Sequence, residues 1–237
     1  MDNYLKSRRY LKIMKIVGIH GSPRGNKSST LKLLNAALDG AKKAGAEVEI
    51  IDVTKLKINY CIGCFTCYKK GKCAQQKDDF IPAFEKVLAA DGVIFSSPVY
   101  IDSVTAQLKT FMDRMTDAVH SKLFDGKYGF SVVTSGGGGD QILLDYLNGY
   151  INRCGGLYTG GTSALMGKGP ADMEKAIKRS GELGEDLVKA ITEKRSYPDQ
   201  EQILKASRER FAMAIKFNKD AWAADYAHWV EKGWIKE

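Results

Sequence analysis

The sequence lacks any long hydrophobic run, and this absence bears on where the protein works. Its apolar stretches are short and interrupted, as at residues 93–95, whereas a helix that spans a bilayer needs about 20 consecutive apolar residues. The first fifteen residues carry five basic groups but neither an apolar core nor a small-residue cleavage site. They therefore do not resemble a secretory signal. We expect a cytoplasmic protein with no membrane partner.

Two common nucleotide-binding motifs are also missing. The G-x-G-x-x-G fingerprint of dinucleotide-binding domains is absent after the first predicted strand. The segment GSPRGNKS differs from a Walker A loop at one position, because Asn26 replaces a glycine. In addition, the later predicted strand ends in serines at 96–97, where such an ATPase needs a magnesium-binding aspartate. An ATPase is therefore the least favoured function.

Carboxylates are absent from one segment whose composition differs from the rest of the chain. Lysine and arginine total 36 and aspartate and glutamate 28, so the net charge is +8. Most of this charge is spread out, and we interpret it as a solvated basic surface with no nucleic-acid partner. The exception is residues 55–77, which contain six lysines, no carboxylate and four of the five cysteines.

What the sequence does contain is a regular alternation of β-branched apolar runs and helix-period stretches. The expected strands are 15–19, 47–53, 92–97, 128–134 and 157–163. The expected helices are 28–44, 79–90, 104–119, 140–154 and 170–192. Strands one, three and four are almost continuously hydrophobic, which indicates cover on both faces. This pattern predicts an α/β fold, a three-layer, doubly wound five-stranded parallel sheet of flavodoxin-like order 2-1-3-4-5.

The pattern changes near the C-terminus. A break with Pro198 at a helix start precedes a polar stretch with a regular apolar stripe. The stripe consists of Leu204, Phe211, Ile215, Trp222 and Trp229. We expect a domain at 1–195, with a cysteine-rich loop at 55–78, and a helical extension at 196–237. The extension packs either on the core or on a partner subunit, and the sequence leaves both open.

The loop after the first predicted strand has the composition of a phosphate site. Glycines let its backbone turn tightly, and a helix N-terminus follows, which offers free N–H groups and a positive dipole end. Arg24 adds a fork-shaped cation that suits a phosphate. The hydroxyls that can donate to phosphate oxygens belong to Ser22, Ser28, Ser29 and Thr30. A single helix-capping serine would not explain this number of polar groups.

Two further loops are expected at the same edge of the sheet. The third strand leads into Pro98, Val99, Tyr100 and Ile101, where a tyrosine can lie against a flat ring. The fourth strand leads into Ser135 and four consecutive glycines, 136–139, which suit a close approach of the backbone to a ligand. Together the three loops predict a planar, phosphorylated cofactor.

The motifs GSPRGNKSST and SSPVYIDSVTAQLKTFMDR, with the glycine loop, resemble the NADPH-dependent FMN reductase family of the flavodoxin-like superfamily. The resemblance covers roughly residues 14–190. It implies that the first loop binds the FMN phosphate through Ser22, Arg24, Ser28, Ser29 and Thr30. It also implies that Pro98, Val99, Tyr100 and Ile101 flank the isoalloxazine, and that Ser135, Gly136, Gly137 and Gly138 close the other side.

The same resemblance carries further expectations. Lys109, Asp113 and Arg114 belong to the second motif. Because Lys109 and Asp113 are also an ordinary i,i+4 helix pair, we assign them structural or dimer-contact roles. The family implies a homodimer or homotetramer. No residue is assigned as catalytic, and of the three histidines only His20, beside the phosphate loop, is a candidate for a role.

The cysteines follow the spacing Cys61-x2-Cys64-x2-Cys67-x5-Cys73. Structural zinc sites usually pair two C-x2-C units across a longer loop, so three successive x2 intervals better suit a 4Fe–4S cluster with a fourth ligand nearby. The spacing resembles that of the iron–sulfur flavoproteins, a branch of the same family. Zinc, a reversible disulfide and a loop with nothing bound remain open alternatives. Cys154 is expected to be a buried bystander.

The leading hypothesis is an FMN-dependent NAD(P)H oxidoreductase. A nicotinamide would deliver a hydride to the flavin, and the electrons would pass to an unidentified redox acceptor, with a 4Fe–4S cluster as a possible single-electron relay. One alternative is a non-enzymatic flavin or iron–sulfur electron carrier. Another is a redox-sensing module that uses the cysteine loop and the C-terminal helix. The sequence does not distinguish NADH from NADPH.

Overall fold

The structure is a computed structural model and describes residues 13–236. Its strands form one sheet in which all neighbouring pairs run parallel. The strands are β1 (Lys15–His20), β2 (Glu47–Asp52), β3 (Gly92–Pro98), β4 (Tyr128–Ser135) and β5 (Leu157–Leu165). Their order, β2-β1-β3-β4-β5, confirms the predicted flavodoxin-like arrangement. The predicted basic leader, apart from residues 13–15, lies outside the described residues.

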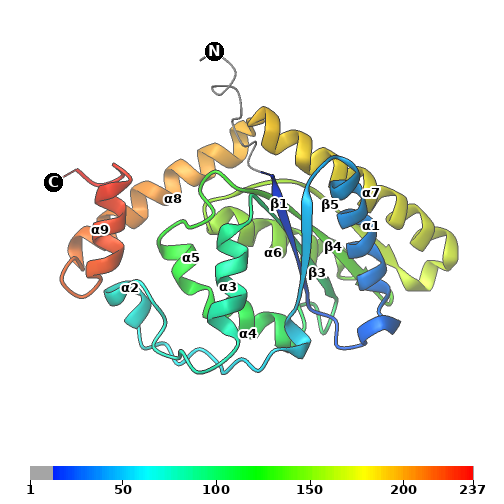
Figure 1. The fold of residues 1–237 in the computed structure, drawn as a ribbon, viewed down its shortest axis with the longest axis horizontal. Coiled ribbons are helices and arrows are strands. Elements are labelled where there is room, and N and C mark those ends of the chain that lie inside the picture. The colour runs from blue at the N-terminus through cyan, green and yellow to red at the C-terminus, as the bar shows by residue number, and fades with distance from the viewer. Residues whose placement is uncertain (1–12, 237) are drawn as a thin grey trace, which may run out of the picture.

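Helices cover both faces of the sheet (Figure 1). The helices are α1 (Ser29–Lys43), α2 (Thr66–Lys70), α3 (Phe80–Ala89), α4 (Ala106–Arg114), α5 (Thr116–His120), α6 (Asp140–Arg153), α7 (Pro170–Glu193), α8 (Pro198–Phe217) and α9 (Ala223–Glu231). Short 3-10 turns lie at η1 (Gly25–Lys27), η2 (Val53–Lys55) and η3 (Met166–Lys168). Within residues 13–236, no helix is both long and apolar enough to cross a membrane.

The strand residues alternate between two hydrophobic cores. Ile16 and Ile94 pack with α1 and α7 on one face. Val17 and Phe95, their immediate neighbours in the chain, pack with α3, α4 and α6 on the other. Successive side chains of a strand point to opposite faces, so a strand covered on both sides must be apolar at consecutive positions. This explains the near-continuous hydrophobic runs and confirms the three-layer prediction.

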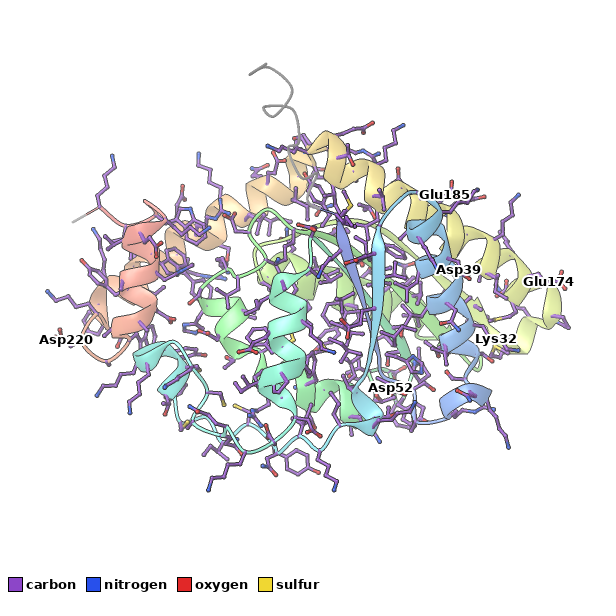
Figure 2. All side chains as sticks on the ribbon, viewed as in Figure 1. Lys32, Asp39, Asp52, Glu174, Glu185 and Asp220 are labelled. Atoms are coloured by element: carbon purple, nitrogen blue, oxygen red, sulfur yellow. The ribbon has the colours of Figure 1, made fainter. Side chains whose placement is uncertain are left out.

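Helices α1 and α7 pack closely against each other because a glycine at the contact has no side chain. A Cβ atom added at Gly184 of α7 would collide with the carbonyl oxygen of Ala37 on α1. At the rim of the same contact, Lys43 Nζ donates to Glu185 Oε1 at 2.8 Å, on the exposed side of the helix pair. Figure 2 labels Glu185 on α7, beside α1. The two helices therefore form one layer that supports β1 and its following loop.

The prediction of a single helix over 104–119 is wrong. The structure has α4 and α5, with Met115 between them at φ −82° and ψ 19°. The Met115 N–H is shared between the carbonyls of Phe111 and Met112, and its side chain is completely buried in the core. The turn therefore buries Met115 and redirects the chain, so that α5 approaches the C-terminal extension.

The C-terminal extension packs on its own chain. It contains two helices, because residues 218–222 turn the chain between α8 and α9. Trp229 is fully buried, and its Nε1 donates to the carbonyl of His120 on α5 at 3.0 Å. Lys122 Nζ donates to Ser207 Oγ of α8 at 3.0 Å. The apolar stripe is thus largely used within the chain, and a dimer contact remains a prediction.

Candidate functional site

The loops that follow β1, β3 and β4 meet at one edge of the sheet. The N–H of Gly21 donates to the carbonyl of Ser96 at 2.9 Å, and Thr105 Oγ1 donates to the carbonyl of Gly21 at 2.5 Å. The N–H of Val99 donates to the carbonyl of Thr134 at 2.8 Å. Here the crossover direction reverses between β1 and β3, which is where doubly wound sheets bind ligands. The three predicted cofactor loops therefore share one location.

The start of α1 retains donors for an anion. Ser28 caps the helix, and its Oγ accepts the N–H of Leu31 at 3.1 Å. This bond uses a lone pair of the hydroxyl and leaves its O–H free to donate. The N–H groups of Ser29 and Thr30, in the first turn, have no acceptor within the helix. Capping and phosphate binding are therefore compatible roles for Ser28.

The remaining residues of the first loop differ in exposure. Ser22 and Thr30 are almost completely buried, whereas Arg24 is exposed. The hydroxyls of Thr30 and Thr134 lie 2.6 Å apart and join the first loop to the end of β4. Thr30 thus also serves as a structural tie, and Arg24 and Lys27 supply accessible positive charge in the loop. The pairing of Thr30 with Thr134 had no local signal in the sequence.

The loop after β3 contains backbone strain. Ile101 and Asp102 have φ values of 47° and 59°, in the left-handed region. This conformation is a genuine outlier for a β-branched residue such as isoleucine, and such strain clusters at binding sites. Ile101 is 97% exposed and Tyr100 is 46% exposed, while Pro98 and Val99 are half-buried. The loop therefore presents apolar side chains to solvent at this edge of the sheet.

The glycine loop after β4 provides open space. A Cβ atom added at Gly136, Gly137 or Gly138 would meet nothing within 4 Å, and none of the three has a positive φ. Neither the backbone conformation nor packing within the described chain therefore requires glycine at these positions. The Ser135 hydroxyl and Gly138 exchange hydrogen bonds that hold the loop in shape. Three glycines in a row therefore still need an explanation, and the open space that they leave beside the loop is what a flat ligand would need.

His20 is the last residue of β1, just before the first loop, and is fully buried. Its Nδ1 is 3.1 Å from Ser96 Oγ, and its Nε2 is buried without a hydrogen-bond partner among residues 13–236. Burial lowers the pKa of His20, although the negative charge of Asp52 acts in the opposite direction. The imidazole is therefore neutral at pH 7 and connects β1 to β3.

The cysteine-rich loop is closed at its base. Asp79 accepts the N–H of Lys57 at 2.7 Å, and Asp78 accepts the N–H of Asn59 at 3.0 Å. These bonds join the two ends of the loop, which Figure 1 shows below α3 and beside α4. At the far end, Tyr68 of α2 stacks on His120 of α5, with 3.7 Å between ring centroids. The loop is therefore held to the domain at its base, through Asp78 and Asp79, and again through Tyr68 of α2.

Arg114, at the end of α4, ties the same loop to the core. Its guanidinium donates to the carbonyls of Asn59 and Gln75 at 2.9 and 2.8 Å. It also forms a buried ion pair with Asp78, with 2.6 Å between nitrogen and oxygen, and it stacks on the ring of Phe80. The sequence identified Arg114 only as a member of a motif. Its role as a clasp depends on partners 34 to 55 residues away, which spacing does not reveal.

Neighbouring motif residues behave as predicted. Lys109 Nζ and Asp113 Oδ1 form an exposed ion pair at 2.6 Å on α4, which contributes only about 0.2–0.5 kcal/mol to helix stability. A dimer contact through this pair stays a prediction. Cys154 is completely buried, as the sequence suggested.

The four clustered cysteines line one pocket of about 330 Å³, together with Arg114. Cys61 and Cys64 are exposed, Cys67 and Cys73 are half-buried, and all are free thiols. Among residues 13–236, however, no three cysteine, histidine or carboxylate side chains converge closely enough to hold a metal ion. The donor chemistry, four thiols around a single pocket, suits an iron–sulfur cluster, but the sulfurs must move closer together to ligate one.

The environments of the thiols shift their pKa values in different directions, which gives a first testable prediction. A hydrogen bond from Thr66 lowers the pKa of the exposed Cys64. Burial, reinforced by the negative charge of Asp117, raises the pKa of Cys67 to about 12, and burial raises that of Cys154 to about 12. Because the thiolate is the nucleophile, we expect iodoacetamide at pH 8 to modify Cys64 of the cluster-free protein well before Cys67 or Cys154. Peptide mass spectrometry over time measures the order.

A matched control is the substitution Thr66→Val, which removes the hydroxyl that lowers the pKa of Cys64. It should slow the modification of Cys64 and leave that of Cys154 unchanged. Equal rates at Cys64 and Cys67 in the unsubstituted protein would contradict the described environments of the two thiols.

Comparison with known proteins agrees with the site. Residues 14–170 match the family described as NADPH-dependent FMN reductase. A protein of Archaeoglobus fulgidus named iron-sulfur flavoprotein is 38% identical over 228 residues, which cover 94% of this chain and all of the relative. An iron-sulfur flavoprotein of Clostridioides difficile is 31% identical over 193 residues, or 80% of this chain and 85% of that protein.

Solved structures resemble the fold at lower identity. RosB, with a bound flavin-derived intermediate, has a TM-score of 0.60 at 17% identity and covers 83% of this chain and 87% of its own. An apo NADH:FMN oxidoreductase has a TM-score of 0.56 at 22% identity, over 79% of this chain and 93% of its own. At these identities the likeness concerns the fold alone. The family match and the full-length relative establish more: the chain belongs to the NADPH-dependent FMN reductase family, in the branch of the iron–sulfur flavoproteins.

Proposed function

We propose that the protein is an FMN-dependent oxidoreductase that takes electrons from NAD(P)H and passes them to a further acceptor. The observation that carries the proposal is the glycine loop at 136–138, where neither backbone conformation nor packing within the described chain calls for glycine. Family membership supports the choice of FMN as the ligand that needs this space. The flavin, when bound, would supply the hydride and single-electron chemistry.

The residues have distinct tasks in binding. The exposed guanidinium of Arg24 and the first-turn N–H groups of α1 would hold the phosphate by charge and hydrogen bonds. The O–H of Ser28 would donate to it, because the helix cap uses only a lone pair of that oxygen. Tyr100 and Pro98 would lie along one side of the ring system, and the glycine loop along the other.

Thr105 and Thr134 would keep these binding loops at fixed positions. Thr105 caps α4 and donates to Gly21 in the first loop, and Thr134 contacts Thr30 and accepts from Val99. The loops are therefore held together before any ligand binds, which reduces the entropy lost on binding. The donor NAD(P)H would have to approach from solvent, over the exposed Tyr100 and Ile101.

We further propose that Cys61, Cys64, Cys67 and Cys73 ligate a 4Fe–4S cluster. The four thiols share one pocket, and curated relatives that match most of this chain are named iron-sulfur flavoproteins. The clasp by Arg114 places a guanidinium in the same pocket, where a positive charge would stabilise a cluster bound by four thiolates. The raised pKa of Cys67 means that its proton must be displaced when iron binds.

The proposal predicts a selective effect of bulk in the glycine loop. We expect Gly137→Val to weaken FMN binding by at least about 10-fold, since a ring that must lie against the loop would meet the new side chain. Stability without FMN should change by no more than about 0.5 kcal/mol, because a Cβ atom here meets no protein atom. Titration of the flavin-free protein with FMN, followed by flavin fluorescence, measures the affinity.

Gly137→Ala is the graded control and should weaken FMN binding less than Gly137→Val. Unchanged FMN affinity in both variants would mean that the flavin does not lie against this loop. A large loss of stability in the flavin-free variants would instead mean that glycine is needed for folding, and the observation that carries the proposal would fail.

A further inference from the structure

Cys67 differs from the other three clustered cysteines because it lies on a helix. It belongs to α2, whereas Cys61, Cys64 and Cys73 lie in segments without helix or strand. An isolated helix shorter than about 12–15 residues is barely stable in water, and α2 has only 5 residues. The position of Cys67 must therefore depend on what α2 packs against.

The next residue of α2, Tyr68, supplies this packing and is 4% exposed. Its ring stacks on that of His120 of α5, with 3.7 Å between centroids and 13° between planes. It also makes an edge contact with Trp222, at 5.7 Å. The hydroxyls of Tyr68 and Thr116 lie 2.6 Å apart. Because ring pairs of this kind stabilise beyond the area that they bury, they hold α2 directly beside Cys67.

His120 is held in turn by the C-terminal extension. Its Nδ1 lies 3.1 Å from Asp225 Oδ2 of α9. Its ring makes edge contacts with the rings of Phe211 and Trp222, each at 5.2 Å between centroids. Tyr68 therefore rests on a ring stack that α8, α9 and the turn between them complete.

A cavity of about 350 Å³ lies next to this ring stack. Its lining includes Cys67, Gly71, Asp117 of α5 and Ala224 of α9. Figure 1 shows α2 beside α9 at this end of the molecule, and the two helices are in contact. Atoms that line a cavity lack packing partners on that side, so the ring stack supplies a larger share of the contact that holds α2.

The two pairs of cysteines differ in how firmly they are placed. Residues 60–65, which contain Cys61 and Cys64, are all exposed and have no regular structure. Cys67 and Cys73 are half-buried, and Cys73 packs against the core. Because local stability is lowest where few buried contacts are made, the exposed pair moves more easily than the half-buried pair.

We propose that the C-terminal extension positions Cys67 for the 4Fe–4S cluster, by holding α2 in place through Trp222 and His120. The inference rests on the cluster ligands proposed above. The sulfurs of Cys61 and Cys64 then approach a fixed Cys67 when the cluster binds. Trp222 is a positioning residue, because it acts on the ligand through Tyr68.

Trp222→Ala removes one side of the ring stack and leaves all four cysteines in place. In the cluster-free protein, we expect iodoacetamide to modify Cys67 about 2- to 10-fold faster than without the substitution, as loss of one aromatic contact implies. The rate at the buried Cys154 should not change. Peptide mass spectrometry over time measures both rates.

The same substitution should weaken cluster retention. After anaerobic reconstitution with ferrous iron and sulfide, iron should pass to a chelator about 2- to 10-fold faster from Trp222→Ala. The affinity for FMN should stay the same, because α9 and the start of α1 lie at opposite ends of the molecule (Figure 1). Trp222→Phe keeps an aromatic ring at this position and should restore most of the retention.

Trp234→Ala is the matched control. Trp234 is also half-buried in the extension, but its rings contact Trp229 and His228 rather than α2, so neither rate should change. Circular dichroism verifies that each variant folds. Tyr68→Leu, which removes the stack from the side of α2, replaces Trp222→Ala should that variant fail to fold.

Cys67 modification and iron retention that Trp222→Ala and Tyr68→Leu both leave unchanged would overturn this inference alone. Equal effects of Trp234→Ala and Trp222→Ala would also overturn it, because the extension would then act through overall stability. An unsubstituted protein that takes up no iron would refute the proposed cluster and, with it, this inference.

Discussion

Replacing Arg114 with methionine is expected to destabilise the protein by about 3–5 kcal/mol, the usual cost of removing one partner from a buried ion pair. The Arg114 side chain is completely buried and that of Asp78 is 5% exposed, so the substitution leaves Asp78 as a buried charge without its ion-pair partner. The substitution also removes both hydrogen bonds to the loop carbonyls of Asn59 and Gln75. Urea unfolding measures the stability, and limited proteolysis of residues 57–79 reports the release of the loop.

Two matched variants separate the contribution of the Arg114 charge to stability from that of the planar shape of its guanidinium. Arg114→Lys keeps the charge but loses the planar fork that reaches two carbonyls and a carboxylate together, so an intermediate loss is expected. Combining Arg114→Met with Asp78→Leu removes the uncompensated carboxylate and should recover part of the stability. A loss below about 1 kcal/mol for Arg114→Met would show that the clasp contributes no more than an exposed ion pair.

The acid dependence of this pair has a defined sign. Burial alone would raise the pKa of Asp78, but hydrogen bonds from Arg114 and from the N–H groups of Asn59 and Phe80 outweigh it and hold the pKa below its usual value. A carboxyl whose pKa is lowered in the folded state adds stability above its unfolded pKa. This stability is lost as the pH falls through the folded pKa, so the cysteine loop should loosen in acid.

Asp117→Asn is expected to stabilise the protein at pH 8 by up to about 4 kcal/mol and to have little effect below pH 4. Burial, reinforced by the negative charge of Asp225, raises the pKa of Asp117 from 3.8 to about 7. The folded state therefore binds this proton more tightly than the unfolded state. The corresponding stability is fully present below about pH 4 and is lost as the pH rises through about 7.

Urea unfolding of both proteins at pH 4 and pH 8 measures this difference. Asp145→Asn, an exposed carboxylate on α6, is the control and should show no such pH dependence. An equal stability difference between Asp117→Asn and the unsubstituted protein at both pH values would contradict the described burial of Asp117. A carboxyl that destabilises the fold at neutral pH while lining a cavity is typical of a functional group.

The layers of the fold were predictable because their signals are local. Consecutive apolar residues such as Ile16 and Val17 must be buried on opposite faces, which predicts a covered parallel strand. The position of the loop between β1 and α1 was equally predictable, since its glycines, hydroxyls and helix start lie within a dozen residues, while phosphate binding by this loop stays a proposal. The predicted helix over 104–119 failed because burial of Met115 depends on the surrounding core, and periodicity alone does not register it.

The rest of the site depends on partners distant in the sequence. Arg114 contacts Asn59 and Asp78, and Thr30 meets Thr134, 104 residues further along. The C-terminal extension presented an apolar stripe, but only its packing on His120 through Trp229 shows that the stripe serves the same chain. Such contacts follow from the topology of the sheet and its helices, and no spacing rule in the sequence encodes them.

The central claim is that FMN binds at the edge where the loops after β1, β3 and β4 meet. Anaerobic purification, followed by an absorption spectrum, FMN quantification and iron analysis, tests it most directly. We expect about one FMN per chain, with a broad brown shoulder and about four irons where the cysteines ligate a cluster, and steady-state NAD(P)H oxidation that a mere electron carrier would lack. A protein that shows no flavin bands, even after FMN is added, would contradict the account.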